Sequence, residues 1–298
     1  MRTRITRTFF AVAAAGVTAG TLGLGAVGAA NAATAQPAHA RVIGSTIATT
    51  SAAGYEASGR DFRYISATLT VPDDDFSGFY QNLYPQEYIQ LSNGSLNGSG
   101  FAVTGDQYVR AGIEACTVAQ SFGVPAGSCP TGDWTSYVEA FNNSLNGPYF
   151  SHYSLLSGVS QGDGVNFSIY YNQAGNELHF TITPPSTSGP AQFYKTQAYG
   201  PTFDHAAALD DFTDSSGVPI ALPPIIHAFK INYILQGALT TYSGARGSFV
   251  GPWTTSPVVA TSNGLPWPSG TVRVSPSRLW SDGLGAARPL DAFSVWGR

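Results

Sequence analysis

Apolar residues recur at every second position through most of this chain, and that period constrains the fold more than any other feature. In residues 63–71 (RYISATLTV), one side of an extended strand carries Ile65, Ala67, Leu69 and Val71, while the other carries mainly hydroxyl groups. Such alternation is typical of half-buried β-strands, because successive side chains point to opposite faces of a sheet. The sequence shows no convincing amphipathic helix. We therefore predict an all-β chain.

A second pair of alternating segments reads as a hairpin. Residues 165–170 and 178–182 are both apolar at every second position, and the turn-forming sequence NQAG lies between them at 172–175. Further strands, separated by Gly and Pro, are predicted at 86–92, 101–104, 107–114, 134–141, 191–199, 229–235, 246–250, 271–274 and around 293–295. Many short strands at this spacing predict an antiparallel β-sandwich or jelly roll.

The N-terminus has the features of an export signal. Three arginines lie within the first seven residues, and residues 9–30 are uncharged and rich in Ala, Gly, Val and Leu. The small-x-small sequences at 30–32 and 38–40 suit signal peptidase. A permanent transmembrane anchor is the alternative, but Gly and Thr dilute the stretch. We expect residues 1–40 to be a signal peptide and the protein to be secreted, extracellular and free of the membrane after cleavage.

The exported part is expected to be one domain with an acidic surface. Residues 41–58 are small and polar and are interpreted as a flexible leader, while residues 59–298 contain no linker or internal repeat. Removing residues 1–40 takes away three arginines and no acid, which changes the formal charge from −4 to −7. This charge argues against a nucleic-acid partner, which needs clustered Lys and Arg. We expect a monomer without a cofactor.

The chain has two cysteines, Cys116 and Cys129, and both lie in the exported part. In an oxidising compartment two cysteines this close, with Gly and Pro between them, most simply form a disulfide that closes a loop. A zinc site is disfavoured because no second Cys/His pair stands at ligand spacing. A reactive thiol remains the alternative.

Three other patterns have a chemical interpretation and a simpler structural one. Residues 158–162 (GVSQG) match the G-x-S-x-G of serine hydrolases, but a predicted strand, not a helix, follows Ser160, so we interpret them as a turn. The acidic residues at 73–75 and 210–214 offer oxygen ligands for calcium, but neither group fits an ordered loop template, and solvated turns are favoured. The histidines show no paired ligand spacing, so no metal site is predicted.

Several segments resemble, in order, the glutamic-peptidase family (eqolisins). Residues 65–72 (ISATLTVP) are close to its V-S-A-T-x-x-V-P strand, and residues 88–94 (YIQLSNG) resemble its W-V-G-I-D-G strand. Residues 134–141 (WTSYVEAF) are similar to Y-x-A-W-Y-E-W-Y-P, and residues 160–163 (SQGD) to its S-x-G-D turn. The resemblance implies a double-sheet, concanavalin A-like sandwich and a secreted acid endopeptidase.

The resemblance also implies where a site would lie. Arg110, in residues 108–112 (YVRAG), stands where the family has its catalytic glutamine. Residues 198–203 (AYGPTF) stand where it has its catalytic glutamate, and Asp204 is the nearest carboxylate. Glu139 matches the family's second acidic groove residue. The candidate catalytic residues are therefore Glu139, Arg110 and Asp204, and the candidate binding residues in the matched segments are Gln90, Trp134 and Tyr137.

Two functions follow from these residues. In the first, catalysis is lost or divergent and the concave face binds an extended peptide or glycan. In the second, the protein is an acid-active endopeptidase in which Glu139 acts as general base and Arg110 stabilises an oxyanion. A structural Arg–Glu ion pair would explain the same two residues. Glycoside hydrolysis ranks last, because no paired-acid strand motif is present.

Overall fold

The computed structural model describes residues 42–49, 52–71, 84–96, 103–115, 134–160, 162–199, 202–213, 230–234, 239–247, 249, 253–260, 273–275 and 292–296. The chain divides into residues 1–38 and 39–298, and all described residues belong to the second unit. The predicted signal peptide and the predicted Cys116–Cys129 disulfide lie outside the described residues, as does the acidic group at 73–75.

The described residues form seventeen β-strands and one short 3-10 helix, η2 (Asn143–Leu145). The strands are β1 (Val42–Ile43), β2 (Ile47–Thr49), β3 (Ala52–Thr70), β4 (Tyr84–Ser92), β5 (Gln107–Ala115), β6 (Trp134–Asn142), β7 (Gly147–Leu155), β8 (Gly164–Asn172), β9 (Glu177–Thr183), β10 (Gln192–Gln197), β11 (Phe203–Thr213), β12 (Lys230–Ile234), β13 (Leu239–Thr241), β14 (Arg246–Gly247), β15 (Thr254–Ala260), β16 (Arg273–Ser275) and β17 (Ala292–Trp296). Within these ranges no helix has the length and apolar character that crossing a bilayer would require.

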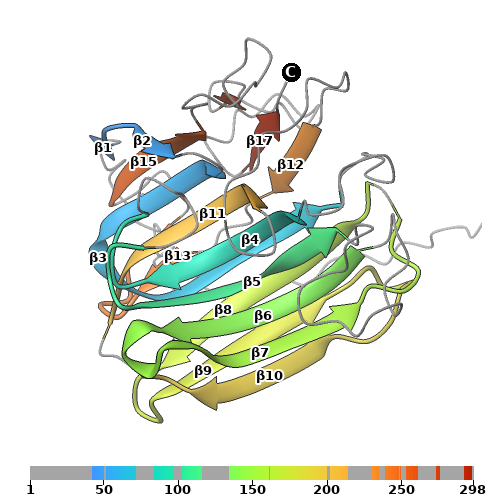
Figure 1. Ribbon diagram of the computed structural model, residues 1–298, viewed down its shortest axis with the longest axis horizontal. Helices are drawn as coiled ribbons and strands as arrows, with labels where there is room; N and C mark the ends of the chain where they lie inside the picture. Colours follow the sequence, from blue (N-terminus) through green and yellow to red (C-terminus); the bar gives the residue numbers. More distant parts are fainter. Residues whose placement is uncertain are drawn as a thin grey trace, which may run out of the picture. The chain divides into compact units, whose positions relative to one another are not determined.

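Backbone pairing arranges the longer strands in two layers (Figure 1). In the first layer the order is the N-terminal part of β3, then β11, β4, β5, β6 and β7, and every pair is antiparallel. In the second layer the C-terminal part of β3 pairs with β8, β8 with β9, and β9 with β10, again antiparallel. The predicted all-β antiparallel sandwich is confirmed.

Strand β3 joins the two layers because it belongs to both. Its residues 52–58 pair with β11, and its residues 64–70 pair with β8. Gly59 lies between these two sets of pairs with a φ of 85°, a conformation that glycine adopts at little cost. A single long strand therefore passes from one layer to the other, and all described strands form one hydrogen-bonded sheet.

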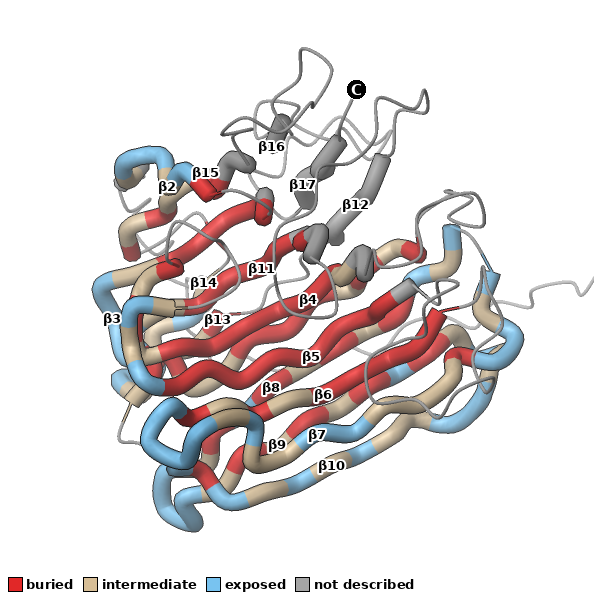
Figure 2. The backbone as a smooth tube through the Cα atoms, in the orientation of Figure 1, coloured by how far each residue is buried: buried red, intermediate tan, exposed pale blue. Residues whose placement is uncertain are grey.

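The main hydrophobic core lies between the two layers. Ile89 and Val109 contribute to it from the first layer, and Phe167, Ile169 and Phe180 from the second, all with at most 1% of their surface exposed. Burial alternates along β8 and β9, as the period of two predicts. Strands β4 and β5 differ from this pattern, because they are buried almost throughout on both faces (Figure 2).

The sheet begins earlier than the sequence analysis expected. Residues 42–49 and 52–58 do not form the predicted flexible leader, since they belong to β1, β2 and the first part of β3. Small residues serve close packing here: a Cβ atom added to Gly54 would overlap the carbonyl oxygen of Ala208 on β11. Their composition was therefore misread, because small side chains permit close backbone approach as well as flexibility.

A similar close approach of two strands, β4 and β5, requires glycine at position 112 on β5. A substitution at Gly112 therefore tests how closely these strands pack. Gly112 lies opposite Tyr88 of β4, and an added Cβ atom would overlap the carbonyl oxygen of Glu87 and lie 2.7 Å from Tyr88 Cα. Because backbone atoms cannot move aside cheaply, we expect Gly112→Ala to lower the free energy of unfolding by about 1–3 kcal/mol in chemical denaturation.

Gly164→Ala is the matched control. Its added Cβ atom would meet only Cγ2 of Thr68, at 2.9 Å, which is the end of a side chain. We expect a smaller loss of stability for this variant. Equal unfolding free energies for the wild type and Gly112→Ala would contradict the close approach of β4 and β5.

Candidate functional site

The first layer buries polar side chains on the face that points away from the main core. Along β4, Ile89 and Leu91 point into the core, so Tyr88 and Gln90 lie on the opposite face. A smaller hydrophobic cluster, which includes Tyr88, lies on that opposite face. We call this face of the first layer, which points away from the main core, the polar face.

Strand register aligns the polar-face residues in three parallel rows that run across β11, β4, β5 and β6 and continue to β7. The Arg110 row contains Ala207, Gln90, Arg110, Glu139 and Ser151. The tyrosine row beside it contains Leu209, Tyr88, Gly112, Tyr137 and Tyr153. The acidic row, on the other side of the tyrosine row, contains Asp211, Gln86, Glu114 and Thr135.

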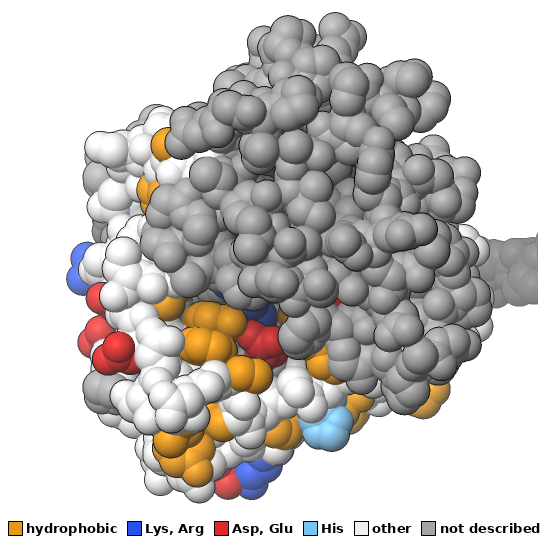
Figure 3. All heavy atoms as spheres, viewed as in Figure 1, with side chains coloured by type: hydrophobic (Ala, Val, Ile, Leu, Met, Phe, Trp, Pro, Cys, Tyr) orange, Lys and Arg blue, Asp and Glu red, His pale blue; other side chains and the backbone are white. Residues whose placement is uncertain are grey.

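Arg110 is the central charge of the site, and its side chain is held on several sides. Its Nε donates to Oε1 of Gln90 at 2.6 Å. Its guanidinium carbon lies 4.0 Å from the ring centroid of Tyr108 and 4.5 Å from that of Tyr88, distances at which cation–π attraction operates. Only 2% of the Arg110 surface is exposed. On the face viewed in Figure 3, a basic and an acidic side chain lie together among hydrophobic ones.

The electrostatics keep Arg110 charged and its tyrosine neighbours neutral. Burial alone would lower the pKa of Arg110, but Tyr88, Tyr108, Tyr137 and Glu139 raise it above its ordinary value. Burial raises the pKa of Tyr88, Tyr108 and Tyr137 well above the usual value, although Arg110 lowers each of them. Tyr108 also hydrogen-bonds to Glu139, and this bond raises its pKa further. The site therefore presents a permanent cation beside phenolic donors.

The acidic row places two buried carboxylates on either side of Gln86. Asp211 and Glu114 both have 0% of their surface exposed. Gln86 donates through Nε2 to Oε2 of Glu114 at 3.3 Å, and the hydroxyl group of Tyr137 donates to Oε1 of Gln86 at 3.4 Å. The hydroxyl group of Tyr88 donates to Oδ2 of Asp211 at 3.4 Å. Hydrogen bonds from the tyrosine row thus reach the acidic row.

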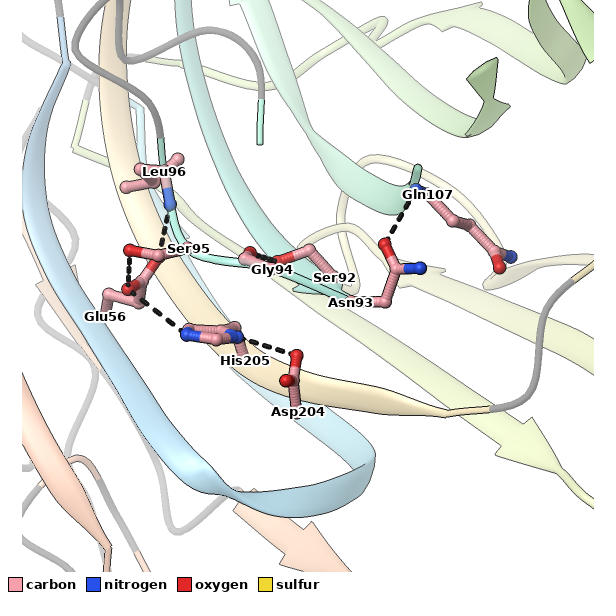
Figure 4. Close-up of polar contacts among 9 residues, drawn as sticks. All are labelled: Glu56, Ser92, Asn93, Gly94, Ser95, Leu96, Gln107, Asp204 and His205. Atoms are coloured by element: carbon pink, nitrogen blue, oxygen red, sulfur yellow. Dashed lines mark hydrogen bonds and ion pairs between the residues drawn. The ribbon is translucent and has the colours of Figure 1, made fainter. Parts of the chain in front are cut away.

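A third polar cluster lies near the end of β4, around Glu56 of β3 (Figure 4). Glu56 Oε1 accepts from the hydroxyl of Ser95 at 2.7 Å, and Oε2 accepts from the backbone N–H of Leu96 at 2.9 Å. His205 on β11 lies between two acids: its Nε2 is 3.9 Å from Glu56 Oε1, and its Nδ1 is 2.7 Å from Asp204 Oδ1. Glu56 therefore anchors the loop that follows β4.

The structure brings together four of the residues that the sequence analysis selected. Gln90, Arg110 and Glu139 are consecutive in the Arg110 row, on three adjacent strands. Tyr137 lies two residues before Glu139 on β6 and shares its face. The expectation that Arg110 and Glu139 lie on one surface is therefore met by the register.

Trp134 and Asp204 do not belong to this group. Trp134 packs in the main core, because it is separated by an odd number of positions from Tyr137 and so points to the other face of β6. Asp204 has 51% of its side chain exposed and contacts His205. Residues 198–203, which were compared with the family's glutamate-bearing strand, mostly precede β11, and that strand supplies Ala207 and Asp211 to the polar face instead.

Sequence reasoning missed several polar-face residues. Asp211 was interpreted as part of a solvated turn, yet it is a buried strand residue. Glu114 lies an even number of positions from Arg110 on one predicted strand, and Gln86 lies an even number from Gln90 on another. This even spacing is the only sequence signal that could have indicated a shared face. Ser160 precedes β8 and its N–H donates to Asp163 Oδ2, so the GVSQG segment is followed by a strand, as predicted.

These groups can bind polar ligands through fixed charges and hydrogen bonds. Arg110 supplies a positive charge, Glu139 a half-buried carboxylate, and the tyrosines provide hydroxyl donors and ring faces. Over the described part of the chain, no three His, Cys, Asp or Glu side chains gather as a metal site would require.

Comparison with known proteins gives a likeness in fold alone. No family model matches the chain, and no curated protein matches it. Scytalido-glutamic peptidase with a transition state analog inhibitor has a TM-score of 0.51 at 13% identity, covering 83% of this chain and 97% of that chain. SCP-B of the eqolisin family, in complex with a tripeptide, has a TM-score of 0.38 at 14% identity and covers 67% of this chain and 83% of its own.

A legume lectin is more distant: Lectin I from Ulex europaeus has a TM-score of 0.28 at 10% identity, covering 56% of this chain and 66% of that chain. At such scores neither SCP-B nor the lectin bears on this chain. The likeness to scytalido-glutamic peptidase supports a glutamic-peptidase-like fold. At 13% identity it supports no statement about activity.

The Glu56 cluster makes stability depend on pH in a defined direction. Burial raises the pKa of Glu56 above its ordinary value of 4.5, although the hydrogen bonds from Ser95 and Leu96 and the charge of His205 lower it, and Asp204 raises it. The folded protein therefore keeps the Glu56 proton to a higher pH than the unfolded chain. The contribution of Glu56 to the free energy of unfolding therefore falls as pH rises from its unfolded to its folded pKa.

Glu56→Gln removes this titration, so we expect the variant to gain stability relative to the wild type as pH rises through that window. Chemical denaturation at a series of pH values measures the difference. Glu177→Gln is the control of opposite sign, because a hydrogen bond from Lys195 lowers the pKa of Glu177 and that stability is lost on acidification. A pH-independent difference for Glu56→Gln would contradict the effect of burial.

Proposed function

We propose that the polar face of this protein binds an extended polymer, a peptide or a glycan, without cleaving it. The observation that carries this proposal is the buried, immobilised guanidinium of Arg110. Its Nε is bonded to Gln90 and two tyrosine rings flank it, so little side-chain freedom remains to be lost on binding. Rows of polar and aromatic side chains across adjacent strands suit a ligand that lies across the sheet.

The same contacts favour binding over catalysis. Acyl transfer requires an activated nucleophile or water and an oxyanion donor that converge on one carbonyl group. The family resemblance places a glutamine and a glutamate in these roles, but Arg110 stands at the position of the glutamine, and Ala207 is the β11 residue in the Arg110 row. Glu139 hydrogen-bonds to Tyr108, which occupies part of its acceptor capacity.

An acid-active endopeptidase is the second candidate, and the adjacency of Glu139 and Arg110 favours it. Glu139 would take a proton from water as general base, and Arg110 would stabilise the oxyanion that forms when this water attacks a peptide carbonyl. The likeness in fold to scytalido-glutamic peptidase is compatible with this activity. Both candidates fit a secreted protein, and export through the N-terminal signal is part of the proposal.

The proposal predicts that the loss of Arg110 weakens ligand binding. We expect Arg110→Met and Glu139→Gln each to reduce affinity for a pool of short blocked peptides or for gluco-oligosaccharides by about tenfold or more, measured by fluorescence anisotropy. The milder Glu139→Gln keeps the test valid where Arg110→Met fails to fold. Arg246→Met, which alters an exposed arginine on β14, is the control and should bind like the wild type.

Cleavage assays distinguish the two candidates. The wild type is incubated with an unfolded substrate protein between about pH 2.5 and about pH 7, where a carboxylate base titrates. Binding without cleavage supports the first candidate. Cleavage that disappears in Glu139→Gln supports the endopeptidase, and a wild type that neither binds nor cleaves contradicts both.

A further inference from the structure

The second layer has an outward face that is open to solvent. Ile169 on β8 and Phe180 on β9 point into the main core, so Tyr170 and His179 lie on the opposite side of these strands. We call this outward face of the second layer the outer face. Tyr170 has 39% of its surface exposed, and the side chain of His179 is 40% exposed. The polar face belongs to the first layer, so the two surfaces are separate.

Aromatic side chains gather on the outer face. Strand register places Tyr64 of β3 opposite Tyr170, and Tyr170 opposite His179. Lys195 of β10 lies opposite His179 and ends this row, which we call the aromatic row. The ring centroids of Tyr170 and His179 are 5.9 Å apart. Phe193, two residues before Lys195, shares the outer face and has 74% of its surface exposed.

The exposed rings are grouped across several strands. A phenyl ring left in water gives the fold no burial energy. Single exposed hydrophobic residues are common on protein surfaces, but hydrophobic residues grouped on one surface mark interaction sites. Tyr170 on β8 and Phe193 on β10 are separated by β9, about 10 Å across the sheet. A ligand that contacts both rings must therefore extend over three strands.

Uncharged polar side chains fill the two rows beside the aromatic row. The nearer row contains Ser66, Ser168, Thr181 and, at its end, Phe193. The row beyond it contains Thr68, Asn166 and Thr183. Hydroxyl and amide groups both donate and accept hydrogen bonds. These rows therefore suit a ligand whose own polar groups also do both.

The charge of the outer face disfavours anionic partners. Lys195 is the one Lys or Arg in the three rows, and its Nζ lies 2.5 Å from Oε1 of Glu177 on β9. Arg246 lies beyond the other end of the aromatic row, because it pairs with Thr240, which is opposite Tyr64. Nucleic acids and anionic membranes attract clustered Lys and Arg, and the three rows contain no such cluster.

A protein partner also fits the outer face less well than a hydroxyl-rich one. The buried centre of a protein interface is mainly apolar, whereas two of the three rows consist mainly of hydroxyl and amide groups. A neutral ligand with apolar surfaces and many hydroxyl groups matches the rings and the polar rows together.

We propose that the outer face is a second binding surface, for a neutral polysaccharide whose sugar rings lie on Tyr170 and Phe193. A pyranose ring has C–H surfaces that pack on aromatic rings, and its hydroxyl groups donate to and accept from Ser, Thr and Asn side chains. Contacts with successive sugar units add along a polymer that crosses the strands. This inference goes beyond the proposed function, because it concerns the other layer and does not involve Arg110.

The test measures how much protein sediments with insoluble cellulose, chitin and starch granules at neutral pH. We expect the wild type to bind at least one of them, and Tyr170→Ala and Phe193→Ala each to lower the affinity by about three- to tenfold. Both side chains are exposed, so these variants should fold normally. Tyr199→Ala is the matched control: Tyr199 is 47% exposed, but its ring contacts Tyr149 of β7 in the first layer.

The outcomes separate this surface from the polar face. Sedimentation that weakens in Tyr170→Ala and Phe193→Ala but not in Tyr199→Ala supports the outer face. The inference is overturned if the folded wild type sediments with none of the three polysaccharides, or if the double variant Tyr170→Ala/Phe193→Ala sediments like the wild type. Sedimentation that only Arg110→Met abolishes assigns the polysaccharide to the polar face and also overturns it.

Light scattering tests the alternative occupant, a second copy of the chain. A wild-type dimer that becomes a monomer in Phe193→Ala would show that another copy covers the outer face, which overturns the inference. Circular dichroism and thermal unfolding establish that each variant is folded.

Discussion

A guanidinium that is removed from water must find hydrogen bonds and compensating charge within the fold, and the polar face is organised around this constraint. Arg110 meets it through Gln90 on β4, the rings of Tyr88 and Tyr108, and Glu139 on β6. These partners come from three adjacent strands, so the Arg110 side chain depends on their register. A shift of one residue in either pairing would turn one set of partners into the core.

The distribution of charge across the polar face explains why its function is expected to be recognition. Arg110 lies beside one acid, Glu139, in its own row, and the tyrosine row separates it from the two carboxylates of the acidic row. Glu114 accepts a hydrogen bond from Gln86, and Asp211 accepts one from Tyr88. Such a surface attracts neutral polar ligands more readily than anions.

The loop that follows β4 lies between the polar-face residues of that strand and Glu56, the carboxyl group whose pKa is raised by burial. Glu56 accepts hydrogen bonds from Ser95 and Leu96, and His205 bridges it to Asp204. Gln90 lies on the same strand, β4, that leads into this loop. The protonation state of Glu56 therefore affects the hydrogen bonds that hold Ser95 and Leu96, just beyond the end of the strand that carries Gln90.

The sequence by itself determined the period of two, and with it the strands, the sandwich and the side of each strand that faces the core. The resemblance to the glutamic-peptidase family further led us to expect Arg110 and Glu139 in one groove. Register and long-range pairing were decided only by the tertiary structure, since no local pattern states which residue lies opposite which. For this reason Asp211 was expected in a turn and residues 41–58 were expected to be a leader, whereas pairing with distant strands makes Asp211 and residues 52–58 part of the sheet. Trp134 was expected on the binding surface for a different reason: its odd spacing from Tyr137 on β6, which turns it into the core, was overlooked.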